Sequence, residues 1–151
     1  MSNENRFNMK YLESSIEVLV RFSETDAMGV VWHGNYLKFF EDAREYFGRE
    51  HGLEYLDCYN NGYFTPIVES QVSHKASVNY GESVLVKAKL IWKPSAKIVF
   101  EYEIINTAHN QIAAYGTTTQ VFLSVDKREL ELIKPEFIRT WEDSKNWIES
   151  E

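Results

Sequence analysis

Every second residue over 16–22 is apolar, which is the period of a β-strand with one buried face. We expect this strand to end near Ser23 and to lead into a loop with two glycines over 24–34. Asn35 is a good N-cap residue and marks the start of a helix, and Gly52 is expected to end it. Along this helix the apolar residues recur at helical spacing, opposite charged ones. They form a wide aromatic stripe: Tyr36, Phe39, Phe40, Ala43 and Phe47.

Long strand patterns joined by short connections dominate the rest of the chain. We expect strands over 67–77, 83–92, 97–107 and 112–125. The connections are too short for a crossover, so neighbouring strands must run antiparallel. An amphipathic segment with Pro135 near its first turn predicts a short C-terminal helix. Together these elements predict an α+β fold, in which an antiparallel sheet buries the long aromatic helix.

Length and composition are those of an ordinary globular domain, with 151 residues, 44% hydrophobic and 26% charged. We expect a single domain over 1–151, with its core at 14–128. A net charge of -7 argues against nucleic acid as a partner. No apolar run approaches the roughly 20 residues that cross a bilayer, and MSNENRFNMK at the start carries no apolar stretch, so we expect neither a membrane partner nor export. The single cysteine, Cys58, fits a reducing compartment, and we expect a cytoplasmic protein.

The densest group of polar residues and glycines lies over 24–36, between the first strand and the helix. Free main-chain N–H groups at a helix start polarise a carbonyl oxygen or bind an anion, and the carboxylate of Asp26 is a candidate base or nucleophile. The alternative is that Asp26 and Asn35 only cap a turn and a helix. The four histidines show no metal-ligand spacing, and we expect no metal.

The run from Arg21 to Asp26, continued by Gly29-Val30-Val31 and His33-Gly34-Asn35-Tyr36, resembles the hotdog-fold acyl-CoA thioesterases of the 4-hydroxybenzoyl-CoA thioesterase family. It is most similar to the bacterial branch associated with the Tol-Pal system, and the resemblance spans about residues 17–125. The resemblance implies the hotdog fold, an antiparallel sheet wrapped around a long central helix. It also implies an acyl-CoA substrate without a separate cofactor, and active sites shared across the interface of a homodimer or a dimer of dimers.

The same resemblance assigns roles within the loop. Asp26 falls on the catalytic carboxylate, which either activates water or attacks the thioester. The main-chain N–H of His33 falls on the group that polarises the thioester carbonyl, and Gly34 and Tyr36 fall on the substrate-binding part of the motif. The imidazole of His33 has the alternative interpretation of a packed or surface side chain at a helix end.

Further roles fall outside the loop. By analogy Thr65 is expected to orient Asp26 from the partner chain, with an ordinary strand start before proline as the alternative. Glu41 is a candidate substrate contact, with an ordinary solvated helix residue as the alternative. The sequence departs from relatives at Phe22, where some carry a tyrosine. It also departs near Leu56, where the 4-hydroxybenzoyl enzymes carry a tryptophan, which speaks against that substrate.

Lys93 and Lys97 cluster in a strand connection, where they are candidates for binding the phosphates of coenzyme A, with Lys75 nearby. The alternative is a solvated turn. Four residues are expected to be structural: His74 as a packed or half-buried side chain, Cys58, and Trp141 and Trp147 as docking groups of the C-terminal helix.

Three classes of function remain to be weighed. A thioester hydrolase acting on acyl-CoA, or on acyl carrier protein, fits the loop best. A hydratase on the same fold would use a histidine and a carboxylate in a sequence setting that is absent here. A domain that binds acyl-CoA without cleaving it is the non-enzymatic alternative, and Asp26 argues against it. The sequence fixes neither the length of the acyl group nor an aromatic or aliphatic preference.

Overall fold

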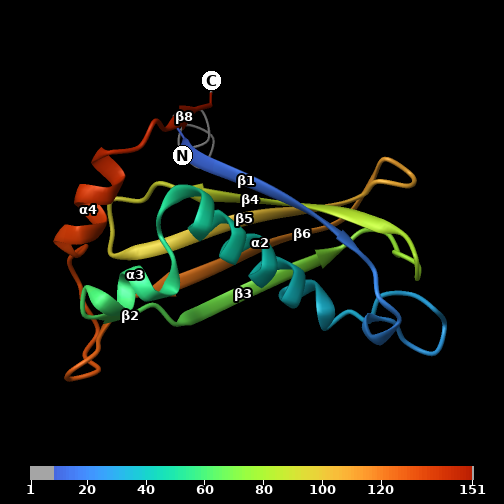
Figure 1. The fold of residues 1–151 in the computed structure, drawn as a ribbon, viewed down its shortest axis with the longest axis horizontal. Coiled ribbons are helices and arrows are strands. Elements are labelled where there is room, and N and C mark those ends of the chain that lie inside the picture. The colour runs from blue at the N-terminus through green and yellow to red at the C-terminus, as the bar shows by residue number, and fades with distance from the viewer. Residues whose placement is uncertain (1–8, 151) are drawn as a thin grey trace.

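In the computed structural model, which describes residues 9–150, a curved antiparallel sheet wraps round the long helix α2 (Figure 1). The N-terminal eight residues, where the sequence predicts neither an export signal nor an anchor, lie outside the described residues, as does Glu151. In chain order the elements are β1 (Lys10–Leu19), the 3-10 helix η1 (Phe22–Glu24), α2 (Asn35–His51), α3 (Tyr55–Asn60), β2 (Tyr63–Phe64), β3 (Ile67–His74), β4 (Ser83–Ile91), β5 (Lys97–Asn106), β6 (Gln111–Val121), β7 (Leu123–Ser124), α4 (Glu136–Asp143) and β8 (Ile148–Glu149).

The main sheet has six strands in the order β3-β6-β5-β4-β1-β8, and every pairing in it is antiparallel. β2 and β7 form a separate two-stranded ribbon. β1 pairs with β4 in continuous register from Tyr11↔Ile91 to Leu19↔Ser83, whereas both pairings of β6, with β3 and with β5, contain a register shift. The antiparallel α+β arrangement is as predicted, and it leaves β3 and β8 as the two edges of the sheet.

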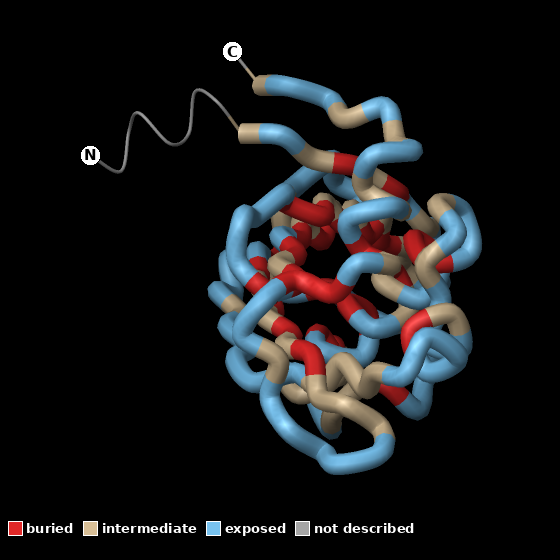
Figure 2. The backbone as a smooth tube through the Cα atoms, turned by 90° about the vertical axis from the view of Figure 1, so that its left-hand side faces the viewer, coloured by how far each residue is buried: buried red, intermediate tan, exposed pale blue. Residues whose placement is uncertain are grey.

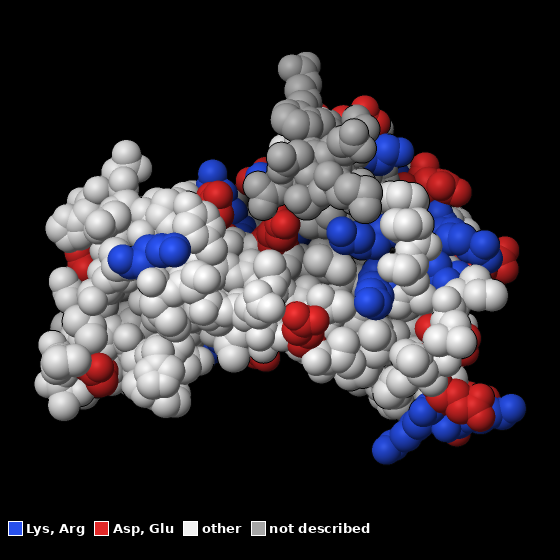
Figure 3. Space-filling view, turned by 180° about the vertical axis from the view of Figure 1, so that it is seen from behind, with Lys and Arg blue, Asp and Glu red and all other residues white. Residues whose placement is uncertain are grey.

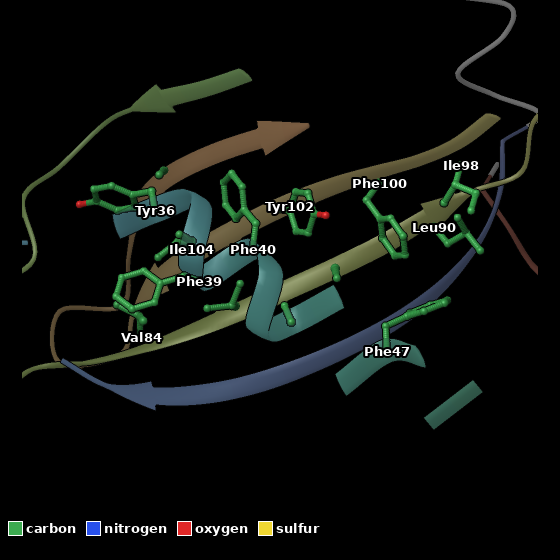
Figure 4. Packing of buried hydrophobic residues seen from close by; sticks show 14 of the residues in the cluster. Tyr36, Phe39, Phe40, Phe47, Val84, Leu90, Ile98, Phe100, Tyr102 and Ile104 are labelled. Carbon is green, nitrogen blue, oxygen red and sulfur yellow. The ribbon is translucent and has the colours of Figure 1, made fainter. Parts of the chain in front are cut away.

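The aromatic stripe of α2 lies against the concave face of the sheet, and each of its five predicted residues is buried, at most 3% exposed. Phe40 stacks on Tyr102 with ring centroids 4.3 Å apart, and Phe47 meets the ring of Phe100 edge-on at 5.1 Å (Figure 4). Burying one such side chain stabilises the fold by about 1.5–3 kcal/mol. Buried segments accordingly run through the middle of the molecule in Figure 2, with exposed segments around them.

The end of α2 is also as predicted. Gly52 adopts a left-handed conformation, with φ of 75°, and its N–H donates to the carbonyl of Gly48. The indole N–H of Trp141 on α4 donates to the carbonyl of His51 at 2.8 Å, and that of Trp147 donates to the carbonyl of Glu142 at 2.9 Å. The Trp141 bond ties α4 to the end of α2, whereas the Trp147 bond stays within the C-terminal segment. Both rings pack against the hydrophobic core, so both tryptophans dock this segment as expected.

The first strand is displaced from its predicted bounds at both ends. It begins at Lys10 because Ser14 continues the buried face of the strand, where its hydroxyl donates to Glu50 at 2.7 Å. It ends at Leu19, and the chain then winds into η1, leaving Phe22 77% exposed. The prediction of a buried strand position at Phe22 was wrong because the carboxylate of Glu24 accepts the N–H of the N-cap residue Arg21 and closes the turn.

Helix α2 differs from its prediction at one point. Gly34 is its N-cap, and Asn35 is its first residue. The Asn35 side chain does not cap the helix but donates to the carbonyl of Glu24 at 2.8 Å. The pattern also gave no prediction for the short helix α3 or for β2 and β8, which are too short to show a period.

Candidate active site

The loop between η1 and α2 is a hydrogen-bonded turn. The N–H of Asp26 donates to the carbonyl of Val30 at 2.9 Å, and the N–H of Gly29 donates back to the carbonyl of Asp26 at 3.0 Å. Gly29 has φ of 77°, a left-handed conformation that glycine adopts at little cost. A β-bridge between Val30 and Asn79 then fixes the turn to the connection that precedes β4. Asp26 is therefore held at a defined position rather than on a free loop.

The two carboxylate oxygens of Asp26 have different surroundings. Its Oδ1 accepts the N–H of Met28 at 2.8 Å, which is the Asx turn that aspartate forms locally. Within residues 9–150, its Oδ2 accepts no hydrogen bond from a protein donor. The capping interpretation thus accounts for one oxygen, and the other is available to a water molecule or a substrate.

The entrance of α2 offers main-chain donors. The N–H of Trp32 donates to Glu24, and the N–H of Asn35 donates to Trp32, each at 2.9 Å. Between them, the N–H groups of His33 and Gly34 find no acceptor in the described part of the chain. Free donors of this kind are expected at the first turn of a helix and are suited to a developing oxyanion.

An open groove of about 390 Å³ brings the loop, the helix entrance and the end of β3 together. Three of the predicted site residues, Asp26, His33 and Tyr36, line it. Its other lining residues are Val31, His74, Lys75, Ala76 and Ser77. Burial raises the pKa of the Tyr36 phenol, so this ring remains neutral and forms an apolar wall of the groove.

His74 was predicted to be a packed or half-buried strand residue, and that prediction was wrong. Its side chain is exposed at the end of the edge strand β3, where no further strand covers it. Its ring lies 4.9 Å from that of Tyr36 and 6.4 Å from that of His33. Lys75 follows it into the groove and so does not lie near Lys93 and Lys97, where the sequence had suggested it. His74 is exposed because β3 is at the edge of the sheet. The alternation of apolar and polar residues along the chain does not reveal the order of the strands, so it could not identify His74 as a residue of the groove.

Two other predicted residues, Glu41 and Thr65, lie in a second cavity of about 510 Å³. It opens beside the second half of α2, between that helix, α3 and the sheet. Its polar lining includes Arg44, which donates to the hydroxyl of Tyr102 at 3.1 Å, and Gln120, which donates to the carbonyl of Thr65 at 2.7 Å. Within one chain the lining of this cavity includes α2 residues from Glu41 to Gly48, whereas the groove with Asp26 lies at the start of the same helix.

Of the third predicted group, Lys93 lies in the exposed connection between β4 and β5, and Lys97 is the exposed first residue of β5. This connection is at the end of the sheet opposite to the loop of Asp26 (Figure 1). Its main chain is held by Lys134, whose ammonium donates to the carbonyl of Lys93 and pairs with Glu142. On the face seen in Figure 3, basic side chains are interspersed with acidic ones and form no broad basic surface.

Two further observations concern other classes of site. Among residues 9–150, no group of three or more His, Cys, Asp and Glu side chains is placed to hold a metal ion. No helix in the same range combines the length and apolar character needed to cross a membrane.

Comparison with known proteins gives a consistent result. The Thioesterase-like superfamily matches residues 20–141 of the chain. A Bacillus subtilis (strain 168) protein, YneP, named as a candidate acyl-CoA thioesterase, is 32% identical over 121 residues, covering 80% of this chain and 86% of YneP.

Two solved structures have the same fold. A DHNA-CoA thioesterase from Staphylococcus aureus is 32% identical with a TM-score of 0.74, and the match covers 87% of each chain. A 1,4-dihydroxy-2-naphthoyl-CoA thioesterase from Synechocystis has a TM-score of 0.76 at 22% identity, covering 88% of this chain and 97% of its own. These matches confirm the predicted hotdog fold.

Proposed function

Because the chain belongs to the thioesterase-like superfamily, we propose that it is an acyl-CoA thioesterase that releases a free acid and coenzyme A. One observation carries this proposal: the groove unites a carboxylate that has a free oxygen with main-chain N–H groups that lack an acceptor in the described chain. A thioester hydrolase needs both, since a base or nucleophile attacks the carbonyl carbon while donors stabilise the oxyanion.

The reaction follows from these groups. Asp26 removes a proton from a water molecule as that water attacks the thioester carbon, or it attacks the carbon itself and water then hydrolyses the anhydride. The carbonyl oxygen becomes an oxyanion and accepts the N–H of His33. The C–S bond then breaks, the carboxylic acid forms, and the coenzyme A thiolate leaves and takes up a proton. Water is the only co-substrate, so the proposed chemistry uses no cofactor.

We further propose that the site is shared between two copies of the chain. In the part of the chain that the structure describes, β3 is an edge of the main sheet, and all but one of its residues are exposed. Two such edges paired antiparallel around a twofold axis bring the His74 end of one β3 beside the Ile67 end of the other. Thr65, two residues before Ile67, would then approach Asp26 of the opposite chain, and the second cavity would adjoin the groove.

Finer assignments complete the proposal. The spacing from Asp26 to Tyr36 supports the 4-hydroxybenzoyl-CoA thioesterase family and, within it, the Tol-Pal-associated branch. Lys75, which lines the groove, is better placed than Lys93 or Lys97 to meet a coenzyme A phosphate of a substrate bound to the same chain. The free thiol of Cys58 supports a reducing location such as the cytoplasm.

Thiol release from a panel of acyl-CoA and acyl carrier protein thioesters tests the activity. We expect turnover to fall by about 10²- to 10⁴-fold in Asp26→Asn, because the amide keeps an oxygen for the Met28 N–H but loses the basic oxygen. Binding of acyl-CoA without thiol release by the unaltered protein would instead assign the non-catalytic function. Near-normal turnover in folded Asp26→Asn would refute the mechanism.

Mixed dimers test the shared site separately. Asp26→Asn and Thr65→Val are each expected to be impaired, and a 1:1 mixture after subunit exchange should regain roughly a quarter of the normal activity, because half of the dimers carry one intact site. A mixture no more active than its components would place all essential groups of a site on one chain.

A further inference from the structure

Glu24 is a buried carboxylate beside the groove that the proposed reaction does not use. Its side chain is 1% exposed, although it is the last residue of the short helix η1 at one end of the molecule. A carboxylate that is removed from water must be compensated by donors. Glu24 accepts the main-chain N–H of Arg21 at 2.8 Å, the Arg21 guanidinium at 3.4 Å and the ammonium of Lys38 at 3.2 Å.

These contacts join two elements. Arg21 caps η1, and Lys38 lies in the first turns of α2, so the carboxylate fastens the end of the first strand to the start of the helix. Burial by itself would raise the pKa of Glu24, but the hydrogen bonds from Arg21 and Lys38 outweigh it and hold the pKa below its usual value. The carboxylate is therefore charged throughout the working range of an enzyme at neutral pH.

The main-chain carbonyl of the same residue makes two more contacts. It accepts the N–H of Trp32 at 2.9 Å and the side-chain amide of Asn35 at 2.8 Å. Trp32 and Asn35 flank the two residues, His33 and Gly34, whose N–H groups remain free. The donors at the helix entrance are thus held from both sides by Glu24.

Asp26 follows Glu24 by two residues, on the same hydrogen-bonded turn. Glu24 is therefore linked to both groups that the proposed reaction uses. It is linked to the attacking carboxylate of Asp26 through the main chain, and to the residues that flank the oxyanion donors through hydrogen bonds. We propose that Glu24 is a positioning residue that sets the placement of Asp26 relative to the His33 N–H, an inference that rests on the proposed function. It touches neither substrate nor reacting atoms, and it acts through Lys38, Asn35 and the turn.

The substitution Glu24→Gln keeps the size of the side chain and removes its charge. An amide offers one acceptor oxygen where the carboxylate serves Arg21 and Lys38 together, so the link between η1 and α2 loosens. Because a displacement of about 1 Å at reacting groups costs up to about a hundredfold in rate, we expect kcat to fall by about ten- to a hundredfold. KM should remain nearly unchanged.

A matched control is the buried pair of Lys134 and Glu142, whose side chains are 6% and 13% exposed. Glu142 belongs to α4, which lies at the end of the molecule opposite to the start of α2 (Figure 1). Glu142→Gln removes a comparable buried charge and should lower the melting temperature without lowering kcat. Hydrogen exchange provides a second readout: in Glu24→Gln, the amides of Met28 and Trp32 should lose protection, while those of the central strands should not.

The outcomes separate cleanly. Normal kcat in folded Glu24→Gln overturns the proposal, because Glu24 would then contribute to stability alone. An equal loss of kcat in Glu142→Gln also overturns it, because the loss would then follow from removing any buried charge and not from the position of Glu24. If Glu24→Gln does not fold, Asn35→Ala removes one contact to the Glu24 carbonyl, and a reduced kcat at unchanged KM supports the proposal while an unchanged kcat refutes it. Failure of the proposed function is distinguishable, since it would leave Asp26→Asn as active as the unaltered protein.

Discussion

The proposed role of His33 separates a main-chain donor from its side chain, and two substitutions distinguish them. His33→Ala keeps the N–H and removes the imidazole, whereas His33→Pro removes the N–H. Proline is unusually well suited here, because the His33 N–H donates to no acceptor within the described chain and no protein hydrogen bond is lost with it. Trp32, which precedes it, lies outside the helix, as proline requires of its predecessor.

The contacts of His33 indicate how much each of the two substitutions should lower kcat. The exposed imidazole makes ring contacts with Trp32 at 4.9 Å and with His74 at 6.4 Å, so its loss should cost no more than about 1.5 kcal/mol of stability. His33→Ala should therefore retain kcat within about fivefold, below the cost of a lost oxyanion donor. Removing one such donor costs about 10²- to 10³-fold in kcat, or about 2.7–4 kcal/mol, and we expect this loss in His33→Pro.

The assay is thiol release under saturating acyl-CoA, together with circular dichroism and sedimentation to show that both variants keep their fold and oligomeric state. The reasoning is refuted in either of two ways. His33→Ala as inactive as Asp26→Asn would make the imidazole itself essential. Full activity in a folded His33→Pro would show that the oxyanion is stabilised elsewhere, with the Gly34 N–H as the next candidate.

Three further predictions concern the scaffold. Gly116→Ala should destabilise the fold by about 1–3 kcal/mol in thermal or urea unfolding, because the new Cβ would lie 2.2 Å from ring atoms of the fully buried Phe40; unchanged stability would show that this ring can move. Burial raises the pKa of the Cys58 thiol to about 11, so the native protein should resist alkylation at pH 8 and react once unfolded. Trp141→Phe should cost about 1 kcal/mol by removing the hydrogen bond to the His51 carbonyl, as measured by urea unfolding.

The sequence predicts those parts of the fold that depend on long periods. The stripe from Tyr36 to Phe47 and the alternation in β4 and β5 are repeated often enough to define both the elements and their buried faces. The ends of elements depend instead on single side-chain contacts. Glu24 closes η1 and shortens the first strand, and Ser14 extends it by bonding to Glu50 from a position that looks polar.

The candidate site divides in the same way. Asp26, His33 and Tyr36 come from one contiguous motif, and the structure brings them into one groove. His74 joins them from β3, through a strand order that local patterns do not encode. Glu41 and Thr65 line a separate cavity of the same chain, and the partner-chain role of Thr65 that the resemblance implied stays a prediction.

The sheet-facing side of α2 and its entrance place different demands on the amino-acid sequence. The sheet-facing side is buried in the core, so bulky aromatic side chains are needed there, and Phe39, Phe40 and Phe47 supply them. In the proposed mechanism the helix entrance acts through N–H groups, which every residue except proline supplies, so the chemistry there would depend on where the backbone lies and not on which side chain it bears. Under the same proposal, the specific side chains of the loop are those that place the backbone, Glu24 and Asn35, together with Asp26, which supplies the carboxylate. Two of these three residues would therefore position the backbone, and one would supply the reactive group.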